Sequence, residues 1–344
     1  MSIKKPHFLF IIILVSIICL YGLQQVIIDG PKTSPPPQVP VEPKILTFCE
    51  EGWGGIYVGS WSRLQEVKEK VDLVSPVWLG LNSNGLVNWD KTNTEALSFF
   101  KKHKLQFLVL VTAGSGRNST AILGSQASRQ NAVNSIYTYL KNVEADGICL
   151  DFEYIQPTLR ETFTEFVKDL KAKMMEKKLL VAVFPYVNWE EPTKEAYDYQ
   201  SLGRLSDGVI VMTYDQHRPK DTPGPVAAGL WVKANLDYLL TRIDNRKLWL
   251  GIAGYGYQWQ SDKNKGTALP AWYCRAKAQR LGFKDTYHPE TGNEHINFKT
   301  ANGAFNIWWE GARGMKEKLA LAKEYKLAGV ALWRLGYEEL EFWK

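Results

Sequence analysis

Two carboxylates stand two positions apart at the end of the apolar segment Asp146-Gly-Ile-Cys-Leu-Asp-Phe-Glu153. The segment predicts a buried β-strand, in which successive side chains point to opposite faces. One face then carries Asp151 and Glu153, with Gly147 and Cys149 in the same row, whereas the other face is purely apolar: Ile148, Leu150 and Phe152. Burying a carboxylate is unfavourable unless the group is paired or used. The apolar face argues against a surface strand with solvated acids, so the pattern predicts acid–base or nucleophilic catalysis by the two carboxyl groups.

The elements that position this pair follow from the rest of the chain. Eight short apolar runs alternate with amphipathic stretches between residue 44 and the end of the chain: 45–50, 73–81, 106–112, 147–153, 179–185, 208–215, 248–255 and 329–333. Helical spacing of apolar residues is clearest over 157–177 and recurs over 128–142, 231–242 and 313–325. This alternation predicts an α/β fold, the (β/α)8 TIM barrel.

Such barrels catalyse at the carboxyl ends of their strands. The predicted strand ends carry acids and aromatic side chains: Glu50, Trp78, Asp151, Glu153, Tyr186, Met212, Tyr214, Asp215, Tyr255, Tyr257 and Trp333. The chain is also rich in aromatic residues, with 13 Trp and 16 Tyr, which fits either a large aromatic core or a cleft in which rings stack on sugars. No glycine-rich phosphate loop is found.

A long insertion, roughly residues 258–310, precedes the last predicted strand. We expect a small α+β lobe between the seventh and eighth strands. Long insertions in compact domains are often binding elements, so the lobe either forms a wall of the cleft or merely packs on the surface.

The N-terminus has the pattern of a membrane segment. Lys4 and Lys5 precede the apolar run 8–23, which Val26-Ile-Ile28 nearly extends. No small-residue cleavage site follows, so residues 1–28 are predicted to be an uncleaved signal anchor rather than a cleaved signal peptide. Lysines on the cytoplasmic side would place the rest of the chain outside the cytoplasm, at the cell envelope; cleavage would make it a secreted protein. Residues 29–43 are proline-rich and predict an extended linker to a domain over 44–344.

Other classes of site find little support. The net charge of +6 is small for 344 residues and no basic stripe marks a nucleic-acid surface. Four cysteines without a Cys/His cluster predict no metal, and we expect no cofactor and a monomer.

The motifs resemble glycoside hydrolase family 18. Asp146 to Glu153 is similar to that family's D-x-x-D-x-D-x-E signature, and Met212-Thr-Tyr-Asp215 to its M-x-Y-D motif. Gly254-Tyr-Gly-Tyr257 fits a sugar site, and Gly329-Val-Ala-Leu-Trp-Arg-Leu-Gly336 resembles the final strand, especially in the branch of envelope and spore-cortex-lytic N-acetylglucosaminidases. The resemblance covers about residues 44–340. It implies hydrolysis of β-linked N-acetylhexosamine glycans such as peptidoglycan, chitin-like oligomers or exopolysaccharide.

The resemblance also implies roles for individual residues. The implied catalytic residues are Glu153 as general acid and base, Asp151 as hydrogen-bond partner of the substrate acetamide, and Tyr214, which would position that acetamide. Substrate binding falls to Asp215, Trp333, Met212, Tyr186, Tyr255, Tyr257 and Trp78, with Asp146 and Cys149 as supporting residues. Cys149 occupies the position of the family's middle aspartate, which puts efficient chitinase activity in question. The alternatives are a non-catalytic, lectin-like sugar-binding barrel and a tethered scaffold.

Overall fold

A closed parallel barrel forms the centre of the protein. The structure is a computed structural model that describes residues 42–261, 263 and 265–344, so the predicted membrane segment lies outside the described residues. Neighbouring strands pair in the order β1-β14-β8-β7-β6-β5-β4-β2, and β1 pairs with β2 to close the barrel. The barrel prediction is confirmed. Its strands are β1 (Lys44–Cys49), β2 (Leu73–Leu81), β4 (Gln106–Thr112), β5 (Gly147–Asp151), β6 (Lys178–Val183), β7 (Gly208–Val211), β8 (Leu248–Ala253) and β14 (Gly329–Trp333).

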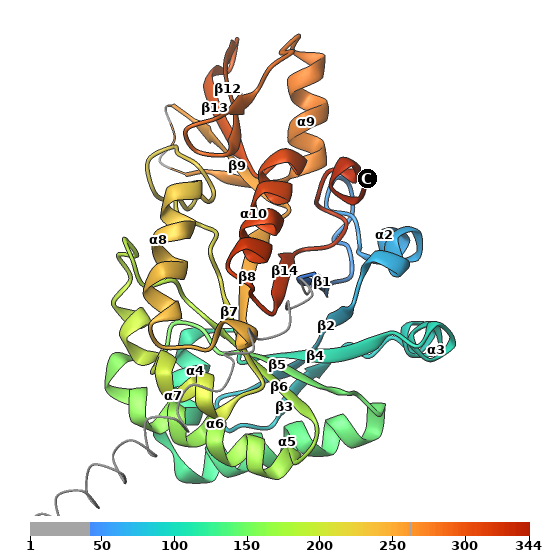
Figure 1. The fold of residues 1–344 in the computed structure, drawn as a ribbon, viewed down its shortest axis with the longest axis vertical. Coiled ribbons are helices and arrows are strands. Elements are labelled where there is room, and N and C mark those ends of the chain that lie inside the picture. The colour runs from blue at the N-terminus through green and yellow to red at the C-terminus, as the bar shows by residue number, and fades with distance from the viewer. Residues whose placement is uncertain (1–41, 262, 264) are drawn as a thin grey trace, which may run out of the picture. The chain divides into compact units, whose positions relative to one another are not determined.

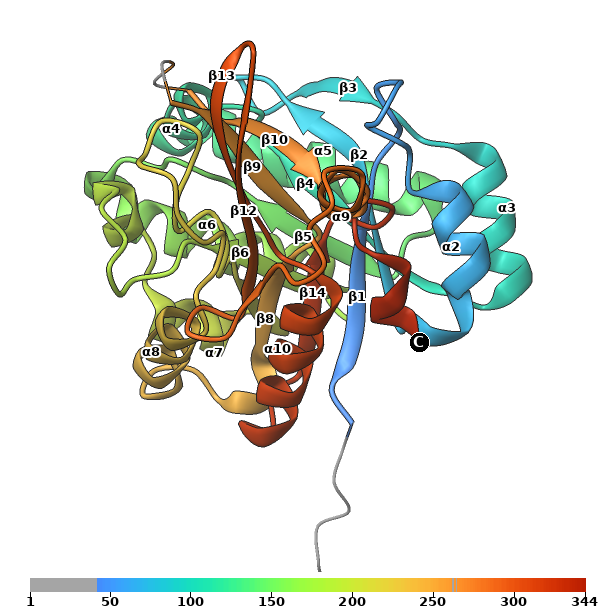
Figure 2. The same ribbon diagram turned by 90° about the horizontal axis from the view of Figure 1, so that it is seen from above.

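Helices surround these strands, as Figure 2 shows. Each crossover from one parallel strand to the next needs a long connection, and amphipathic helices provide it here. The α-helices are α2 (Trp61–Val67), α3 (Thr94–His103), α4 (Gly116–Gly124), α5 (Gln126–Val143), α6 (Arg160–Met174), α7 (Tyr199–Leu205), α8 (Gly229–Leu240) and α10 (Ala312–Glu324). Short 3-10 helices are η1 (Lys68–Lys70), η2 (Pro157–Leu159), η3 (Pro192–Ala196), η4 (Asn245–Lys247) and η5 (Leu340–Trp343).

Two apolar layers follow from the alternation along the strands. The barrel interior is filled by inward-facing side chains: Leu46, Phe48, Leu73, Leu108, Leu110, Cys149, Leu180, Ile210, Trp249 and Ala331. The outward-facing residues pack against helices. In β5 and just beyond it, Ile148, Leu150 and Phe152 are fully buried in this outer layer, and Phe152 stacks on Phe166 of α6 at 5.6 Å between ring centroids.

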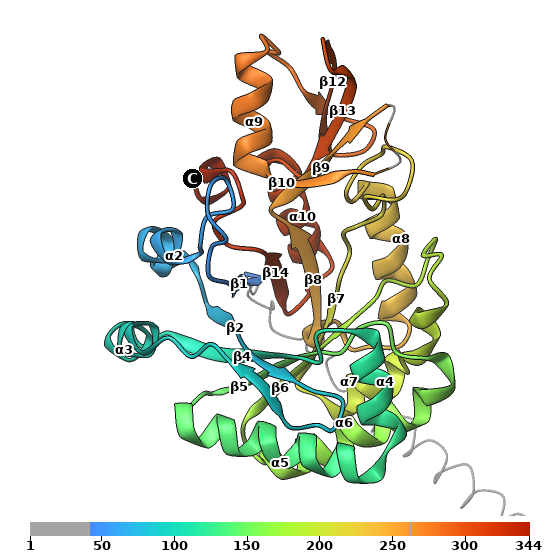
Figure 3. The same ribbon diagram turned by 180° about the vertical axis from the view of Figure 1, so that it is seen from behind.

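A second sheet lies between β8 and α10. It contains β9 (Tyr255–Gln260), β10 (Thr267–Pro270), β11 (Tyr287–His288), β12 (Asn293–Thr300) and β13 (Gly303–Trp309), in the order β10-β9-β13-β12-β11, with α9 (Ala271–Arg280). One face of the sheet packs on α9 around Ile296, Ile307 and Trp309. In Figures 1 and 3 this lobe stands at the end of the molecule farthest from α5 and α6.

Polar contacts join the lobe to the rest of the domain. Arg275 of α9 forms an ion pair with Glu294 inside the lobe at 2.7 Å and another with Glu339, after β14, at 3.1 Å. The Trp309 indole N–H also donates to Glu339. The Tyr57 hydroxyl, after β1, donates to the carbonyl of Ala268 in β10. These contacts hold the lobe against the loops at the carboxyl ends of the strands.

Two further observations complete the fold. A short strand that the sequence analysis did not predict, β3 (Val87–Asp90), pairs antiparallel with the end of β2. Within residues 42–344, as far as the structure describes them, no helix has the length and apolar character needed to cross a membrane.

Phe152→Ala should destabilise the barrel by about 3–5 kcal/mol, because the change leaves a cavity between β5 and α6. Urea unfolding followed by tryptophan fluorescence measures this loss. Phe152→Leu, which keeps most of the volume, should lose much less. Equal stability of Phe152→Ala and the unchanged protein would contradict this packing.

Candidate active site

Asp151 and Glu153 lie at the carboxyl end of β5, where the register pairs Asp151 with Thr112 of β4. Both residues are half-buried. Burial raises the pKa of Glu153, and the negative charges of Asp151 and Asp215 raise it further. Burial also raises the pKa of Asp151. The increase in pKa is larger for Glu153, so this carboxyl group holds a proton at pH values at which an exposed glutamate is ionised.

Asp151 has an oxygen without a partner. Its Oδ1 atom is buried and accepts no hydrogen bond from any described residue. Buried polar atoms are nearly always hydrogen-bonded in native proteins, and the exceptions call for an explanation. An N–H donor on a bound ligand would satisfy this oxygen.

Asp215 belongs to the same cluster. It follows β7 with a left-handed backbone, φ 58°. The hydroxyl groups of Tyr255 and Tyr257 both donate to its Oδ1, the latter at 2.7 Å. Burial raises the pKa of Asp215, whereas the two hydroxyl groups lower it. Both tyrosines come from β9, so the first strand of the inserted sheet completes the site.

Tyr214 lies among the three acids. Burial raises the pKa of its phenol, and the charges of Asp151, Glu153 and Asp215 raise it further. Space for the ring comes from Gly251 of β8, where an added Cβ would lie 3.1 Å from a ring carbon of Tyr214. The phenol is therefore a neutral donor beside the carboxylates.

Trp333 and Met212 lie at the carboxyl ends of their strands, each in line with the inward-facing residues of that strand. Trp333 ends β14, two positions after inward-facing Ala331, and its half-buried ring lies 5.2 Å from that of Phe48. Met212 is buried just beyond β7, two positions after inward-facing Ile210. Together they supply apolar surface at the mouth of the barrel.

Cys149 lies one layer below the acids, in the apolar interior with Leu110 and Leu180. Burial raises the pKa of its thiol well above the ordinary value, and the charge of Asp151 adds to this. The residue directly beneath Asp151 is therefore neutral.

Two predicted binding residues are not brought to this cluster. Trp78 points outward from β2 and packs on Phe100 of α3 and Phe107 of β4. Tyr186 stacks on Tyr238 of α8, with ring centroids 4.3 Å apart. Both rings therefore belong to the layer outside the barrel.

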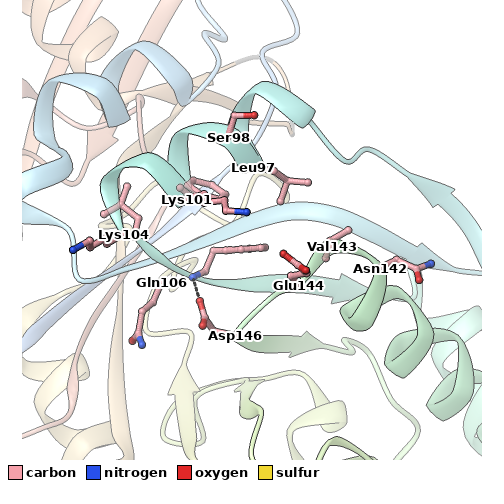
Figure 4. Close-up of a pocket in the computed structure, with 12 residues that line it drawn as sticks. Leu97, Ser98, Lys101, Lys104, Gln106, Asn142, Val143, Glu144 and Asp146 are labelled. Atoms are coloured by element: carbon pink, nitrogen blue, oxygen red, sulfur yellow. Dashed lines mark hydrogen bonds between the residues drawn. The ribbon is translucent and has the colours of Figure 1, made fainter.

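Asp146 lies at the opposite end of β5, as Figure 4 shows. Its Oδ2 accepts a hydrogen bond of 2.9 Å from the backbone N–H of Phe107, which ties the start of β5 to β4. The residue also lines a surface pocket of about 490 Å³ between α3 and α5. This position suits a structural role in the strand pairing rather than contact with Asp151 and Glu153.

The structure adds residues near the acids that the sequence analysis did not identify. Tyr197, after η3, is fully buried, and its hydroxyl donates to the carbonyl of Phe152 at 3.0 Å. The charges of Glu153 and Asp151 help raise the pKa of Tyr197. It stands in no motif, so no sequence signal could have found it.

Arg218 pairs with Glu191 and Asp221, and its charge lowers the pKa of Asp215. Its distance of three residues from Asp215 was an available signal.

The arrangement can protonate a leaving oxygen and stabilise positive charge. The pKa of Glu153 is raised more than that of neighbouring Asp151, a difference that separates an acid from its partner. In the described part of the chain no cluster of three or more His, Cys, Asp or Glu residues could hold a metal ion.

Comparison with known proteins gives a consistent result. The family model for glycosyl hydrolases family 18 matches residues 55–338. The glycosylase YvbX of Bacillus subtilis is 24% identical over 299 residues, which cover 83% of this chain and 86% of that protein. The cortical fragment-lytic enzyme of Bacillus anthracis is 26% identical over 257 residues, 70% of this chain but 59% of that longer protein.

Solved structures agree. A chitinase from Chromobacterium violaceum superposes with a TM-score of 0.79 at 26% identity, covering 88% of this chain and 96% of that one. The spore cortex-lytic enzyme SleL of Bacillus megaterium shares the fold, with a TM-score of 0.78 at 23% identity over 90% of this chain and 74% of that one. With its barrel, its paired acids on β5 and a family match over most of its length, this chain belongs to glycosyl hydrolases family 18 and hydrolyses glycosidic bonds.

Proposed function

We propose that this protein hydrolyses β-linked N-acetylhexosamine glycans with retention of configuration, using the substrate's own acetamide group as the nucleophile. The observation that carries the proposal is the unpartnered, buried Oδ1 of Asp151 beside a Glu153 whose pKa is raised. A carboxylate nucleophile is the usual choice of retaining glycosidases, and family 18 is among the exceptions.

In the first step the proton on Glu153 passes to the glycosidic oxygen as its bond to the anomeric carbon breaks. The acetamide oxygen forms a bond to that carbon and gives a positively charged oxazolinium. The acetamide N–H donates to Asp151 Oδ1, whose charge opposes that of the intermediate. The Tyr214 hydroxyl holds the acetamide in its attacking position, which is a contribution from orientation.

In the second step the ionised Glu153 takes a proton from water. The water oxygen attacks the anomeric carbon, and the bond to the acetamide oxygen breaks. Asp215, held by Tyr255 and Tyr257, adds negative charge near the developing cation and accepts hydrogen bonds from sugar hydroxyls. Trp333 provides an apolar floor under the reacting sugar.

The relatives indicate the class of glycan. They include a cortical fragment-lytic enzyme and chitinases, and peptidoglycan, chitin-like oligomers and exopolysaccharide all offer the required acetamide. Mass spectrometry of the products from these three substrates would identify the glycan. Release of single sugars or of longer fragments would separate exo from endo action.

We further propose that the protein acts outside the cytoplasm at the cell envelope, with residues 8–28 as a membrane anchor. The support is the basic start of the chain, the apolar run after it and the absence of a small-residue cleavage site in the sequence. A mature N-terminus near residue 24 would show instead that the protein is secreted.

Glu153→Gln should lower kcat on N-acetylglucosamine oligomers or peptidoglycan by about 10²–10⁴-fold, because the amide cannot transfer a proton. The matched control is Glu144→Gln, since Glu144 is exposed at the opposite end of β5. It should keep full activity. Full turnover by Glu153→Gln would refute the assignment, and glycan binding without product by the unchanged protein would favour the lectin-like alternative.

The rate should fall at alkaline pH as Glu153 loses its proton. Burial and two neighbouring acids raise the pKa of Glu153, so activity is present below this raised pKa and is lost as pH rises through it. The pH profile of kcat/KM on a fluorogenic oligomer measures this limb. A decline already complete near the ordinary glutamate pKa of about 4.3 would contradict the buried, protonated acid.

Tyr257→Phe should reduce kcat/KM by about tenfold, the scale of a hydrogen bond to a charged group. Losing this donor raises the pKa of Asp215, so the acidic limb of the pH profile should move to higher pH. Tyr287→Phe is the control, because it removes a similar hydroxyl–carboxylate bond to Glu317 in an exposed setting. An unchanged acidic limb in Tyr257→Phe would show that the ionisation of Asp215 does not control the activity at low pH.

A further inference from the structure

Basic residues gather at the end of the barrel opposite the active site. We call this end the basal face; it consists of the last turns of the barrel helices and the segments that lead into the next strands. Its ranges are 42–44, 68–72, 101–106, 141–146, 171–178, 204–207, 242–247 and 323–328. They contain 17 Lys or Arg against nine Asp or Glu, an excess of eight positive charges. Because the whole chain has a net charge of +6, all remaining residues together have a net charge of −2.

These basic side chains are available to a partner. Twelve of the 17 are exposed. Lys101, Lys102 and Lys104, at the end of α3, form no ion pair with any described residue, and Figure 4 shows Lys101 and Lys104 beside the start of β4. Local ion pairs neutralise others, such as Lys171 with Asp207 and Arg246 with Asp244.

Helix ends explain part of this distribution. A cation near the C-terminus of a helix interacts favourably with the helix dipole, so each lysine has a local reason to be there. A (β/α)8 barrel brings all those helix ends to one side, because its strands are parallel and its helices return antiparallel to them. The charges therefore add up over one face.

The same face also carries an exposed apolar residue, whose position the helix dipole does not explain. Met175 directly follows α6, with 64% of its surface exposed and a positive φ of 51°. It lies between Lys173 and Lys177. A flexible apolar side chain flanked by lysines suits the boundary between lipid headgroups and acyl chains.

The course of the chain favours a membrane over other anionic partners. Residue 44, the first of β1, belongs to the basal face, and Figure 2 shows β1 starting at the lower side of the coloured ribbon. The sequence before it contains the apolar run 8–23 and the linker 29–43. A linker of that length spans about 45 Å when extended, so it permits contact between the domain and the bilayer without enforcing it.

We propose that the basal face docks on an anionic phospholipid membrane surface, an inference that rests on the membrane anchor proposed above. Basic residues near such a surface are attracted to it, and the attraction decays within a Debye length. Docking would orient the barrel with Asp151 and Glu153 on the side away from the bilayer. The active site would then face the glycans outside the membrane.

Vesicle binding by residues 42–344, which form one compact unit, tests the proposal without the apolar segment. Vesicles of phosphatidylglycerol and phosphatidylcholine should retain this domain at low salt, whereas pure phosphatidylcholine should not. Lys101→Gln, Lys102→Gln and Lys104→Gln together should weaken binding at least about tenfold. The matched control changes Lys284, Lys299 and Lys316 to Gln; these lysines are also exposed but lie outside the basal face. It should bind almost as the unchanged domain does.

Three results would overturn the proposal. The first is a failure of the domain to bind anionic vesicles, and the second is an equal loss of affinity in the two triple variants, which would show that only net charge matters. Binding to a soluble polyphosphate chain but not to vesicles would assign the face to an anionic envelope polymer. Hydrolysis of soluble oligomers should stay unchanged in both triple variants, which separates this test from that of the catalytic proposal.

Discussion

The site depends on the burial of three carboxyl groups at the mouth of one barrel. Asp151, Glu153 and Asp215 have raised pKa values chiefly because the surrounding protein excludes water from them. The same exclusion strengthens their mutual repulsion, which favours a proton on one of them. Glu153 holds it, since Asp151 and Asp215 both act on it. The raised pKa of Glu153 is thus a consequence of where the strands end, and the rest of the fold maintains that arrangement.

The inserted lobe is part of this arrangement. Its first strand, β9, supplies both tyrosines that hydrogen-bond Asp215, and its helix α9 is anchored through Arg275 to Glu339, after β14. A buried carboxylate that accepts two hydroxyl groups is stabilised in its ionised form. The lobe therefore lowers the pKa of Asp215 against the effect of burial, whatever further role it has in binding a glycan. Cys149 has a comparable indirect effect, because a buried neutral thiol leaves Asp151 without a charged neighbour beneath it.

Much of the fold was predictable because strands and helices follow from the periodicity of apolar residues. All eight predicted barrel strands are present, and the alternation within β5 correctly separated the acids from Ile148, Leu150 and Phe152. The same alternation could have excluded Trp78: Leu73 and Val77 face inward in β2, so Trp78 faces the helices. Tyr186 was beyond this reasoning. It lies three residues after β6, where hydrogen bonds from the N–H groups of Tyr186 and Val187 to Asn235 turn the chain towards α8.

The sequence by itself determined the barrel, the pair of acids and the family, because local periodicity and motif spacing are properties of neighbouring residues. Only the tertiary structure decided which aromatic rings reach the acids, that Tyr197 and Arg218 join them, and that Glu153 is the carboxyl group that keeps a proton. It also brought lysines from separate helices to one face opposite the site. Desolvation and the sum of charges depend on residues far apart in the chain, so neither is visible until the strands have closed.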